Sequence, residues 1–281
     1  MPGVRYIFLA AILFTGAFAA GQSGDSAAIE SSIGLRDPGP EDDWRLVWSD
    51  EFDVDGLPDT SRWTYEEGFL RNNEAQYYTR ARRENARVEG GHLIIEARKE
   101  PYRGAEITSA SLTTQGRAAW TYGRIEVRAK LPTGRGTWPA IWMLGTNITE
   151  VDWPACGEID IMENVGFDPD RVHSYVHTAA FNHVIGTQKG SSLIIERPYD
   201  DFHIYAAEWY EDRIDFFVDG RTHFTFENTG GGPDEWPFDE PHYLILNLAI
   251  GGGWGGQEGI DDSIFPQQYV IDYVRIYKRI D

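Results

Sequence analysis

The chain has 281 residues, which is enough for one large domain or two small ones. Its 25 Lys and Arg residues stand against 45 Asp and Glu residues, so the formal net charge is −20 at pH 7. A field of that sign repels phosphate backbones and anionic lipids, which argues against a nucleic-acid-binding role and a membrane-surface role. It is also unfavourable for binding a strongly sulfated polymer, whereas a neutral polymer is indifferent to it.

The beginning of the chain differs from the rest. Residues 1–19 combine Arg5 with an apolar run and an Ala-Phe-Ala cleavage sequence, which is typical of a secretory signal peptide. Residues 20–42 are rich in Gly, Ser, Asp and Pro and are predicted to be a flexible lead-in. Residues 43–281 are predicted to form the folded domain, and they contain no apolar run of membrane-spanning length. We therefore expect a secreted protein.

Beyond the lead-in, the sequence consists of short alternating runs separated by turn signals. The clearest are 88–97, where a strand is preceded by a Gly-Gly pair, 122–131, 213–226, 243–250 and 269–277. The run 213–226 is predicted to be a hairpin that turns on Asp219-Gly220. Long helical periodicity and internal repeats are absent from the sequence. This pattern predicts an all-β fold, in the form of a sandwich.

Three carboxylates occur in one apolar, Gly-bounded run at 157–166, which reads as a buried strand. Side chains alternate across a strand, so Glu158 and Asp160 share one face, whereas Glu163 has the opposite parity. A β-bulge at or near Met162 would return Glu163 to the carboxylate face, and bulges are common beside active sites. We therefore predict a bulge there.

Folding does not require three acids on one face of a sheet, because they repel one another. Hydrolysis of a glycosidic bond uses two carboxyls, one ionised and one protonated, and a third acid can help to maintain that difference. With the bulge, Glu158 and Glu163 would lie on the order of 13 Å apart at the backbone. Their side chains would have to lean over Asp160 to reach the separation of about 5–5.5 Å that a retaining mechanism uses. The alternative is a solvated polar face on an edge strand.

The segments 135–144 (RGTWPAIWML) and 153–163 (WPACGEIDIME) resemble the core signature of glycoside hydrolase family 16, and most closely its laminarinase (endo-β-1,3-glucanase) branch. The resemblance extends over about residues 44–277. It implies a jelly-roll β-sandwich of two antiparallel sheets, with a substrate cleft on the concave face and a retaining mechanism. By matching position, Glu158 would be the nucleophile, Glu163 the general acid/base and Asp160 the assisting acid.

The same resemblance and the local sequence supply candidate substrate contacts. These are Trp142, Trp153, Trp138, His177, Asn72, Trp254, Arg117 and Glu258. Trp142 and Trp153 match family positions that hold the sugar next to the cleavage point, and His177 matches a residue that hydrogen-bonds substrate near the acid/base. Trp254 lies on a Gly-rich loop, whose residues are too small and flexible to form part of a core. Core packing is the alternative for each Trp, and ordinary solvation is the alternative for Arg117 and Glu258.

Two other kinds of site have to be weighed. His173 and His177 flank Tyr175 at strand spacing, so a zinc pair is an alternative, although no third ligand is evident. Cys156 is the only cysteine, which excludes an internal disulfide, and a thiol nucleophile is an alternative to the carboxylates. No local Cys-His pairing supports that alternative, and a free cysteine usually behaves as a small buried hydrophobe.

A structural calcium ion is implied by the resemblance, whereas no cofactor is expected for catalysis. The family often binds calcium on the convex face through an acid on the last strand and nearby backbone oxygens. Asp272 interrupts the apolar face of that strand, where a buried acid needs a partner. Glu51, Gly91 and Asp272 are therefore the predicted calcium ligands. The alternative for Asp272 is a salt bridge with Arg or Lys.

These observations predict a secreted, endo-acting, retaining hydrolase of β-1,3-glucosidic bonds in laminarin-type β-glucans. One alternative is a same-fold hydrolase of mixed-linkage glucan, agarose or carrageenan. The other is a non-catalytic β-glucan-binding protein, which the fold alone cannot distinguish from an enzyme. The presence of all three acids favours the enzyme. We expect a monomer whose partner is the polysaccharide, with no nucleic acid and no membrane.

Overall fold

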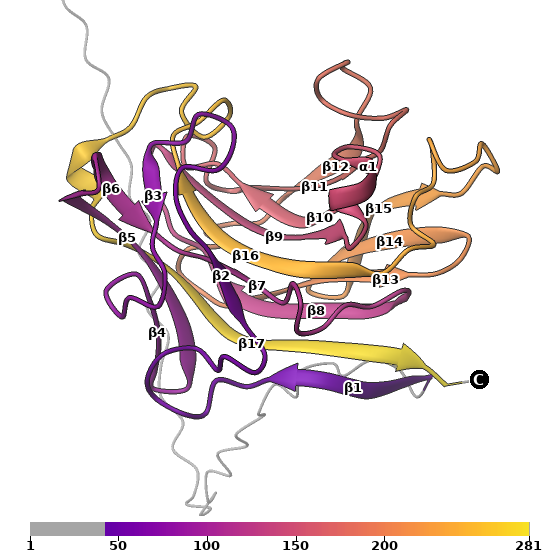
Figure 1. Cartoon of the computed structure of the whole chain (residues 1–281), viewed down its shortest axis with the longest axis horizontal. Helices are drawn as coiled ribbons and strands as arrows, with labels where there is room; N and C mark the ends of the chain where they lie inside the picture. Colours follow the sequence, from indigo (N-terminus) through magenta and orange to yellow (C-terminus); the bar gives the residue numbers. More distant parts are fainter. Residues whose placement is uncertain (1–42, 281) are drawn as a thin grey trace, which may run out of the picture. The chain divides into compact units, whose positions relative to one another are not determined.

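The computed structural model of the protein describes residues 43–280 (Figure 1). The predicted signal peptide 1–19 and lead-in 20–42 lie outside the described residues. Between 43 and 280 the chain is almost entirely β, as predicted, and its helical elements are α1 (Ile148–Val151) and the short 3-10 turn η1 (Asp262–Ile264). No helix in this part of the chain has the length and apolar character needed to cross a membrane.

Two sheets make up the fold. The larger contains β1 (Trp44–Asp50), β3 (Gln76–Tyr78), β4 (Ala86–Glu89), β5 (His92–Tyr102), β6 (Ala105–Ser109), β8 (Gly123–Lys130), β13 (His203–Trp209), β14 (Arg213–Val218), β15 (Arg221–Glu227) and β17 (Gln267–Arg279). Its order is β15-β14-β13-β8-β17-β5-β6-β3, with β1 beside β17 and β4 beside β5. Most neighbours in this order are distant in sequence, as expected of a jelly roll.

The smaller sheet carries the acidic run. Its strands are β2 (Thr64–Glu66), β7 (Ser111–Thr113), β9 (Thr137–Gly145), β10 (Glu158–Asn164), β11 (Arg171–His177), β12 (Lys189–Ile194) and β16 (His242–Ile250). They are ordered β12-β11-β10-β9-β16-β7-β2, and every pairing in this sheet is antiparallel. The acidic strand β10 is therefore an interior strand, which removes the alternative of a solvated edge.

The predicted strands are present. The runs 122–131, 243–250 and 269–277 correspond to β8, β16 and β17, and the hairpin β14–β15 turns on Asp219-Gly220, where both residues have positive φ. In the run 88–97 the predicted strand, β5, follows the Gly90-Gly91 pair, and this pair forms the turn from β4. Both glycines have positive φ, a backbone conformation that a β-branched or bulky residue avoids.

The main core lies between the two sheets, and a second apolar cluster lies on the outer face of the smaller one. Along β9, Ile141 and Met143 point into the main core, whereas Trp142 and Leu144 belong to the second cluster with Cys156. The smaller sheet is therefore apolar on both faces at its centre. This places the acids that share the outer face of β10 in surroundings with little water.

Candidate active site

The acidic strand contains the predicted bulge. Asp160 pairs with Tyr175 on β11, but the next pair joins Glu163 to His173, so β10 advances three residues while β11 advances two. The register with β9 slips at the same place. Ile161 and Met162 are both fully buried in the core between the sheets. The extra residue therefore turns Glu163 to the face that carries Glu158 and Asp160.

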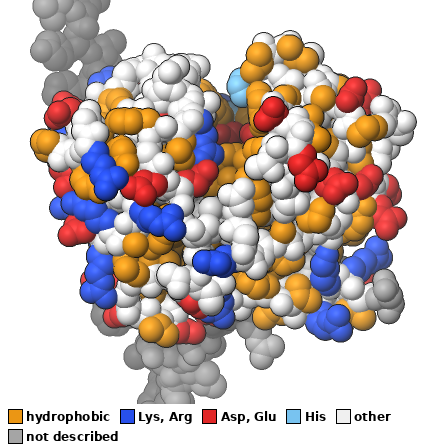
Figure 2. Space-filling model, viewed as in Figure 1, with side chains coloured by type: hydrophobic (Ala, Val, Ile, Leu, Met, Phe, Trp, Pro, Cys, Tyr) orange, Lys and Arg blue, Asp and Glu red, His pale blue; other side chains and the backbone are white. Residues whose placement is uncertain are grey.

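The register arranges the outward-facing side chains of the smaller sheet in three rows across the strands. The rows are His173-Glu163-Ala140-Asn247-Ser111, Tyr175-Asp160-Trp142-Ile245-Thr113 and His177-Glu158-Leu144-Tyr243. Each acid is thus flanked by an aromatic or imidazole ring from β11. Figure 2 shows a hollow between two raised walls on this part of the surface, with acidic side chains on its floor.

Each glutamate on β10 accepts a hydrogen bond from a tryptophan. The indole nitrogen of Trp153 lies 2.7 Å from Glu158 Oε2, and that of Trp138 lies 2.9 Å from Glu163 Oε1. An N–H bond to a carboxylate favours its charged form and fixes the orientation of its oxygens. The structure therefore brings two predicted substrate contacts, Trp153 and Trp138, directly to two predicted catalytic acids.

The third acid lies between the two glutamates and is the most deeply buried. Asp160 is 2% exposed, and His177 Nε2 lies 3.3 Å from its Oδ2 atom and 3.8 Å from Glu158 Oε1. The carboxyl groups of Glu158 and Asp160 lie close enough to repel each other when both are charged, which favours a proton on one of the two. His177, predicted to contact substrate, is thus placed against the carboxyl pair.

Burial shifts the titration of all three acids in the same direction. Loss of hydration raises the pKa of Asp160 well above its usual range, with repulsion from Glu163 adding to it. Burial and the charge of Asp160 raise the pKa of Glu158 to about 8, and the contribution from Asp160 disappears once Asp160 holds a proton. Burial raises the pKa of Glu163 to about 7, despite the opposing effect of the bond from Trp138. Because the groups interact, protons leave the set one after another, and the acids do not all ionise together.

The two remaining aromatic candidates, Trp142 and Trp254, lie in different places. Trp142 is 8% exposed and lies on the outer face of β9, not in the main core; its indole N–H donates to Asn247 Oδ1 at 2.7 Å. Trp254 lies 5.7 Å from Trp138 between ring centroids, and the carbonyl of Asn72 accepts a hydrogen bond from the backbone of the same loop. Trp138, Trp254 and Asn72 therefore gather near Glu163.

Two candidate contacts are not connected to the acids. Arg117 is exposed on the turn after β7, and Glu258 is exposed on the loop that follows β16. Within residues 43–280, neither side chain makes a hydrogen bond or ion pair with the acids of β10. Their predicted contact with substrate stays a prediction.

Sequence reasoning missed a polar group at the far side of Trp142. The guanidinium of Arg71 lies 4.8 Å from the Trp142 ring centroid and is ion-paired with Glu66 on β2. The Glu66 carboxylate also accepts a hydrogen bond from Ser111 at 2.6 Å. Arg71 directly precedes the candidate contact Asn72, so its place in the sequence could have indicated it. Nothing in the sequence indicated Glu66, because its strand is only three residues long and far from the acids in sequence.

The metal and thiol alternatives can be compared with this geometry. Glu158, Asp160 and His177 each offer one atom within 4.8 Å of the others, a spacing that a metal ion could use. His173 is outside this group, and its Nδ1 atom lies 3.2 Å from the Tyr175 hydroxyl, so the suggested His173–His177 zinc pair is not formed. Burial raises the pKa of the Cys156 thiol to about 11, which disfavours a thiolate nucleophile.

The predicted calcium ligands are near one another in the larger sheet. Ile271 pairs with Leu93 and Val274 with Asp50, so Asp272 lies in β17 beside the Gly91 turn and close to Glu51. The Asp272 carboxylate is ion-paired with Arg128, and His92 Nε2 lies 3.6 Å away. This pairing with Arg128 is the alternative that the sequence left open. Calcium binding stays a prediction.

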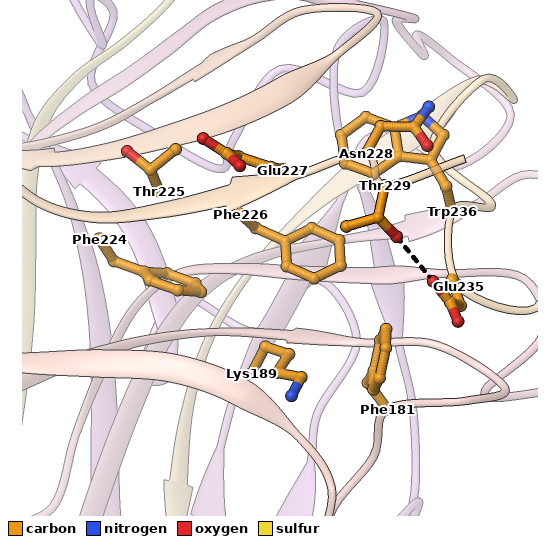
Figure 3. A pocket seen from close by; sticks show the side chains of 10 residues that line it. All are labelled: Phe181, Lys189, Phe224, Thr225, Phe226, Glu227, Asn228, Thr229, Glu235 and Trp236. Atoms are coloured by element: carbon orange, nitrogen blue, oxygen red, sulfur yellow. Dashed lines mark hydrogen bonds between the residues drawn. The ribbon is translucent and has the colours of Figure 1, made fainter. Parts of the chain in front are cut away.

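A second hollow, of about 360 Å³, lies beside β15 and the loops next to it (Figure 3). Its lining includes Phe181, Phe224, Phe226 and Trp236, and Lys189 Nζ lies 4.7 Å from the centroid of the Phe181 ring. Phe226 stacks on Trp236 with ring centroids 5.6 Å apart. None of the predicted site residues lines this hollow, so the candidate chemistry belongs to the acidic face of the smaller sheet.

Comparison with known proteins agrees with this geometry. The family model described as glycosyl hydrolases family 16 matches residues 73–275. A beta-glucanase of Rhodothermus marinus is 56% identical over 247 residues, which cover 85% of this chain and 86% of the relative. The X-ray structure of the laminarinase from Rhodothermus marinus matches with a TM-score of 0.83 at 55% identity, over 85% of this chain and 98% of that one. A structure of a non-specific endo-β-1,3(4)-glucanase of this family matches with a TM-score of 0.81 at 50% identity, over 85% and 92% of the two chains.

The raised pKa of Glu163 predicts a pH-dependent cost to stability. The folded state keeps a proton on Glu163 up to about pH 7, whereas the unfolded chain releases it near its ordinary pKa of 4.5. Stability is therefore lost as pH rises through this interval. Glu163→Gln should raise the melting temperature at about pH 8 and change it little at about pH 5. For a domain of this size, each kcal/mol of unfolding free energy corresponds to roughly 2–4 °C in melting temperature. The exposed Glu150→Gln should have no such pH dependence, and an equal effect of Glu163→Gln at both pH values would contradict the shift.

The calcium prediction has a separate test. If Asp272 binds calcium, EDTA should lower the melting temperature and added calcium should restore it, because a ligand that binds only the folded state stabilises it. Asp272→Asn should remove the response to both reagents. An unchanged melting temperature in the unsubstituted protein would leave Asp272 with the Arg128 ion pair alone.

Proposed function

Because the chain belongs to glycosyl hydrolases family 16, in its laminarinase-like branch, we propose that it is a secreted, endo-acting hydrolase of β-1,3-glucosidic bonds in laminarin-type β-glucans, acting with retention of configuration. The observation that carries this proposal is the bulged strand β10. It presents Glu158 and Glu163 on one face, with Asp160 between them and an indole N–H bonded to each glutamate.

In the proposed mechanism the two glutamates have different tasks. Glu158, ionised, attacks the anomeric carbon while Glu163 protonates the leaving oxygen, and Glu163 then activates the water that hydrolyses the glycosyl-enzyme. Trp153 and His177 both favour the charged form of Glu158. Asp160 is more deeply buried than Glu158, so burial favours a proton on Asp160. Asp160 thereby leaves Glu158 free to act as the nucleophile.

The surroundings of the acids suit a neutral sugar chain. Trp142 and Trp254 supply aromatic surface on either side of the acidic row, and Arg71 with Glu66 adds charged hydrogen-bonding groups beyond Trp142. The strongly acidic chain would repel a sulfated polysaccharide, which favours a glucan over a carrageenan. The likeness to a non-specific endo-β-1,3(4)-glucanase makes mixed-linkage glucan the first other substrate to compare. We propose that the protein acts as a monomer.

Turnover of a polysaccharide panel with and without Glu158 tests the proposal. We expect short oligosaccharides from laminarin, less or no release from mixed-linkage glucan, agarose and carrageenan, and a loss of at least about 10³-fold in Glu158→Ala. Azide should restore turnover in that variant and give a glycosyl azide of inverted configuration, because the small anion occupies the space left by the carboxylate. The exposed Glu150→Ala is the matched control and should retain full activity. Release from a galactan alone would overturn the substrate, and binding without release from any polymer would overturn the enzymatic proposal.

The two indole bonds predict changes on different limbs of the pH profile of kcat/KM. Trp153→Phe removes a bond that lowers the pKa of Glu158, so the acid limb, where the nucleophile ionises, should move to higher pH. Trp138→Phe removes the corresponding bond to Glu163, so the basic limb, where the general acid loses its proton, should move to higher pH. The converse pattern would show that the roles of the two glutamates are exchanged.

A further inference from the structure

The bulge in β10 has a backbone carbonyl that accepts a hydrogen bond from a side chain of the neighbouring strand. Ile161 and Met162 together face the single residue Ser174 of β11, because the flanking pairs are Asp160 with Tyr175 and Glu163 with His173. The hydroxyl of Ser174 donates a hydrogen bond to the carbonyl oxygen of Ile161 at 2.8 Å. A side chain of the neighbouring strand therefore satisfies the carbonyl inside the bulge.

Ser174 lies on the inner face of the smaller sheet. It is fully buried, and its neighbours on that face, Val172 and Val176, belong to the core between the sheets. The other partner of its hydroxyl is His223, whose Nε2 atom lies 3.1 Å away. His223 comes from β15, which is in the other sheet. The bulge of β10 is thus linked across the sandwich.

The position of His223 depends on a second bulge. The pairing of β14 with β15 passes from Phe216 with Phe224 to Phe217 with Thr222, so His223 is an extra residue on β15. An extra residue re-aims its side chain, and here the imidazole turns inward to Ser174. Two bulges, one in each sheet, therefore meet through one serine hydroxyl.

The proton positions in this link follow from counting donors. Ser174 has one hydroxyl proton, which it donates to the Ile161 carbonyl, so its oxygen accepts the proton of His223 Nε2. The Nδ1 atom of His223 is then an unprotonated acceptor, and it is buried without a partner among the described residues. Burial lowers the pKa of His223 to about 4, so the imidazole stays neutral at the pH values where the acids of β10 titrate.

We propose that Ser174 and His223 are positioning residues, which hold the bulge of β10 in place and so aim Glu163 at the leaving oxygen of the substrate. A register slip of one residue would move Glu163 from the outer face to the core face, so what holds the bulge also sets the acid/base. Glu158 and Asp160 precede the bulge and depend on it less. The inference rests on the proposed function only in that it takes Glu163 to be the general acid/base.

Kinetics on two kinds of substrate test the proposal. Ser174→Ala should lower kcat on laminarin about 10- to 100-fold with little change in KM, because a small displacement of a catalytic group costs this order of rate. On a dinitrophenyl β-laminaribioside the leaving group departs without a proton, so the first chemical step does not need the general acid. In Ser174→Ala the rate of the dinitrophenolate burst should therefore fall by less than about threefold. Ser174→Thr keeps the hydroxyl and should retain most of the laminarin activity.

Matched variants separate positioning from simple loss of stability. Ser191 pairs with Ser174 on the adjoining strand β12, so Ser191→Ala is the control and should resemble the unsubstituted protein. His223→Leu should weaken laminarin turnover in the same direction as Ser174→Ala, whereas His223→Gln keeps a donor and should be milder. Equal losses on both substrates, or full laminarin activity in Ser174→Ala, would overturn the proposal.

A spectroscopic readout does not need turnover. The indole N–H of Trp138 is bonded to Glu163, so its proton resonance, identified by its loss in Trp138→Phe, reports where that carboxyl lies. Ser174→Ala should move this resonance towards the position of an unbonded indole, and Ser191→Ala should not. An unchanged resonance in Ser174→Ala would overturn the inference. If the unsubstituted protein cleaves no β-glucan, the proposed function fails, while this resonance still decides the role of Ser174.

Discussion

One extra residue in β10 is the constraint on which the site depends. In an unbroken strand, Glu163 would share the core face with Ile159 and Ile161, where a carboxylate has no water and no cationic partner. The bulge places Ile161 and Met162 together in the core and returns Glu163 to the face of Glu158. It thus converts a sequence that reads E-x-D-x-x-E into a row of acids, without requiring an acid between the sheets.

The environment that makes these acids useful also makes them costly. The outer face of the smaller sheet carries its own apolar cluster, so the acids lose hydration, and their pKa values rise together. Indole N–H groups recover part of the lost hydration for each glutamate, whereas the Oδ2 atom of Asp160 has no hydrogen-bond partner among the described residues. The site therefore resembles other sites in which a protein shifts the pKa values of its carboxyl groups towards neutral pH at the expense of stability.

The sequence was sufficient for features that depend on neighbouring residues. The parity of Glu158, Asp160 and Glu163 predicted the bulge, and alternation with turn residues predicted the sandwich. Features that depend on sheet order could not be predicted in this way. Arg71 meets Trp142 and Asp272 meets Arg128 only because the chain crosses between distant strands, and the pattern of one strand does not specify its neighbours.

The link from β10 to β15 changes how the site is divided between the sheets. The smaller sheet supplies all three acids of the site, so its outer face alone would suggest that the larger sheet has no part in the chemistry. The Ile161 carbonyl, however, is held by a serine whose hydroxyl also contacts a histidine of the other sheet. That hydroxyl lies in the core, where water cannot replace either partner at low cost. The packing of the two sheets therefore stabilises the fold and, through this polar contact, sets the direction of one carboxyl on the opposite face.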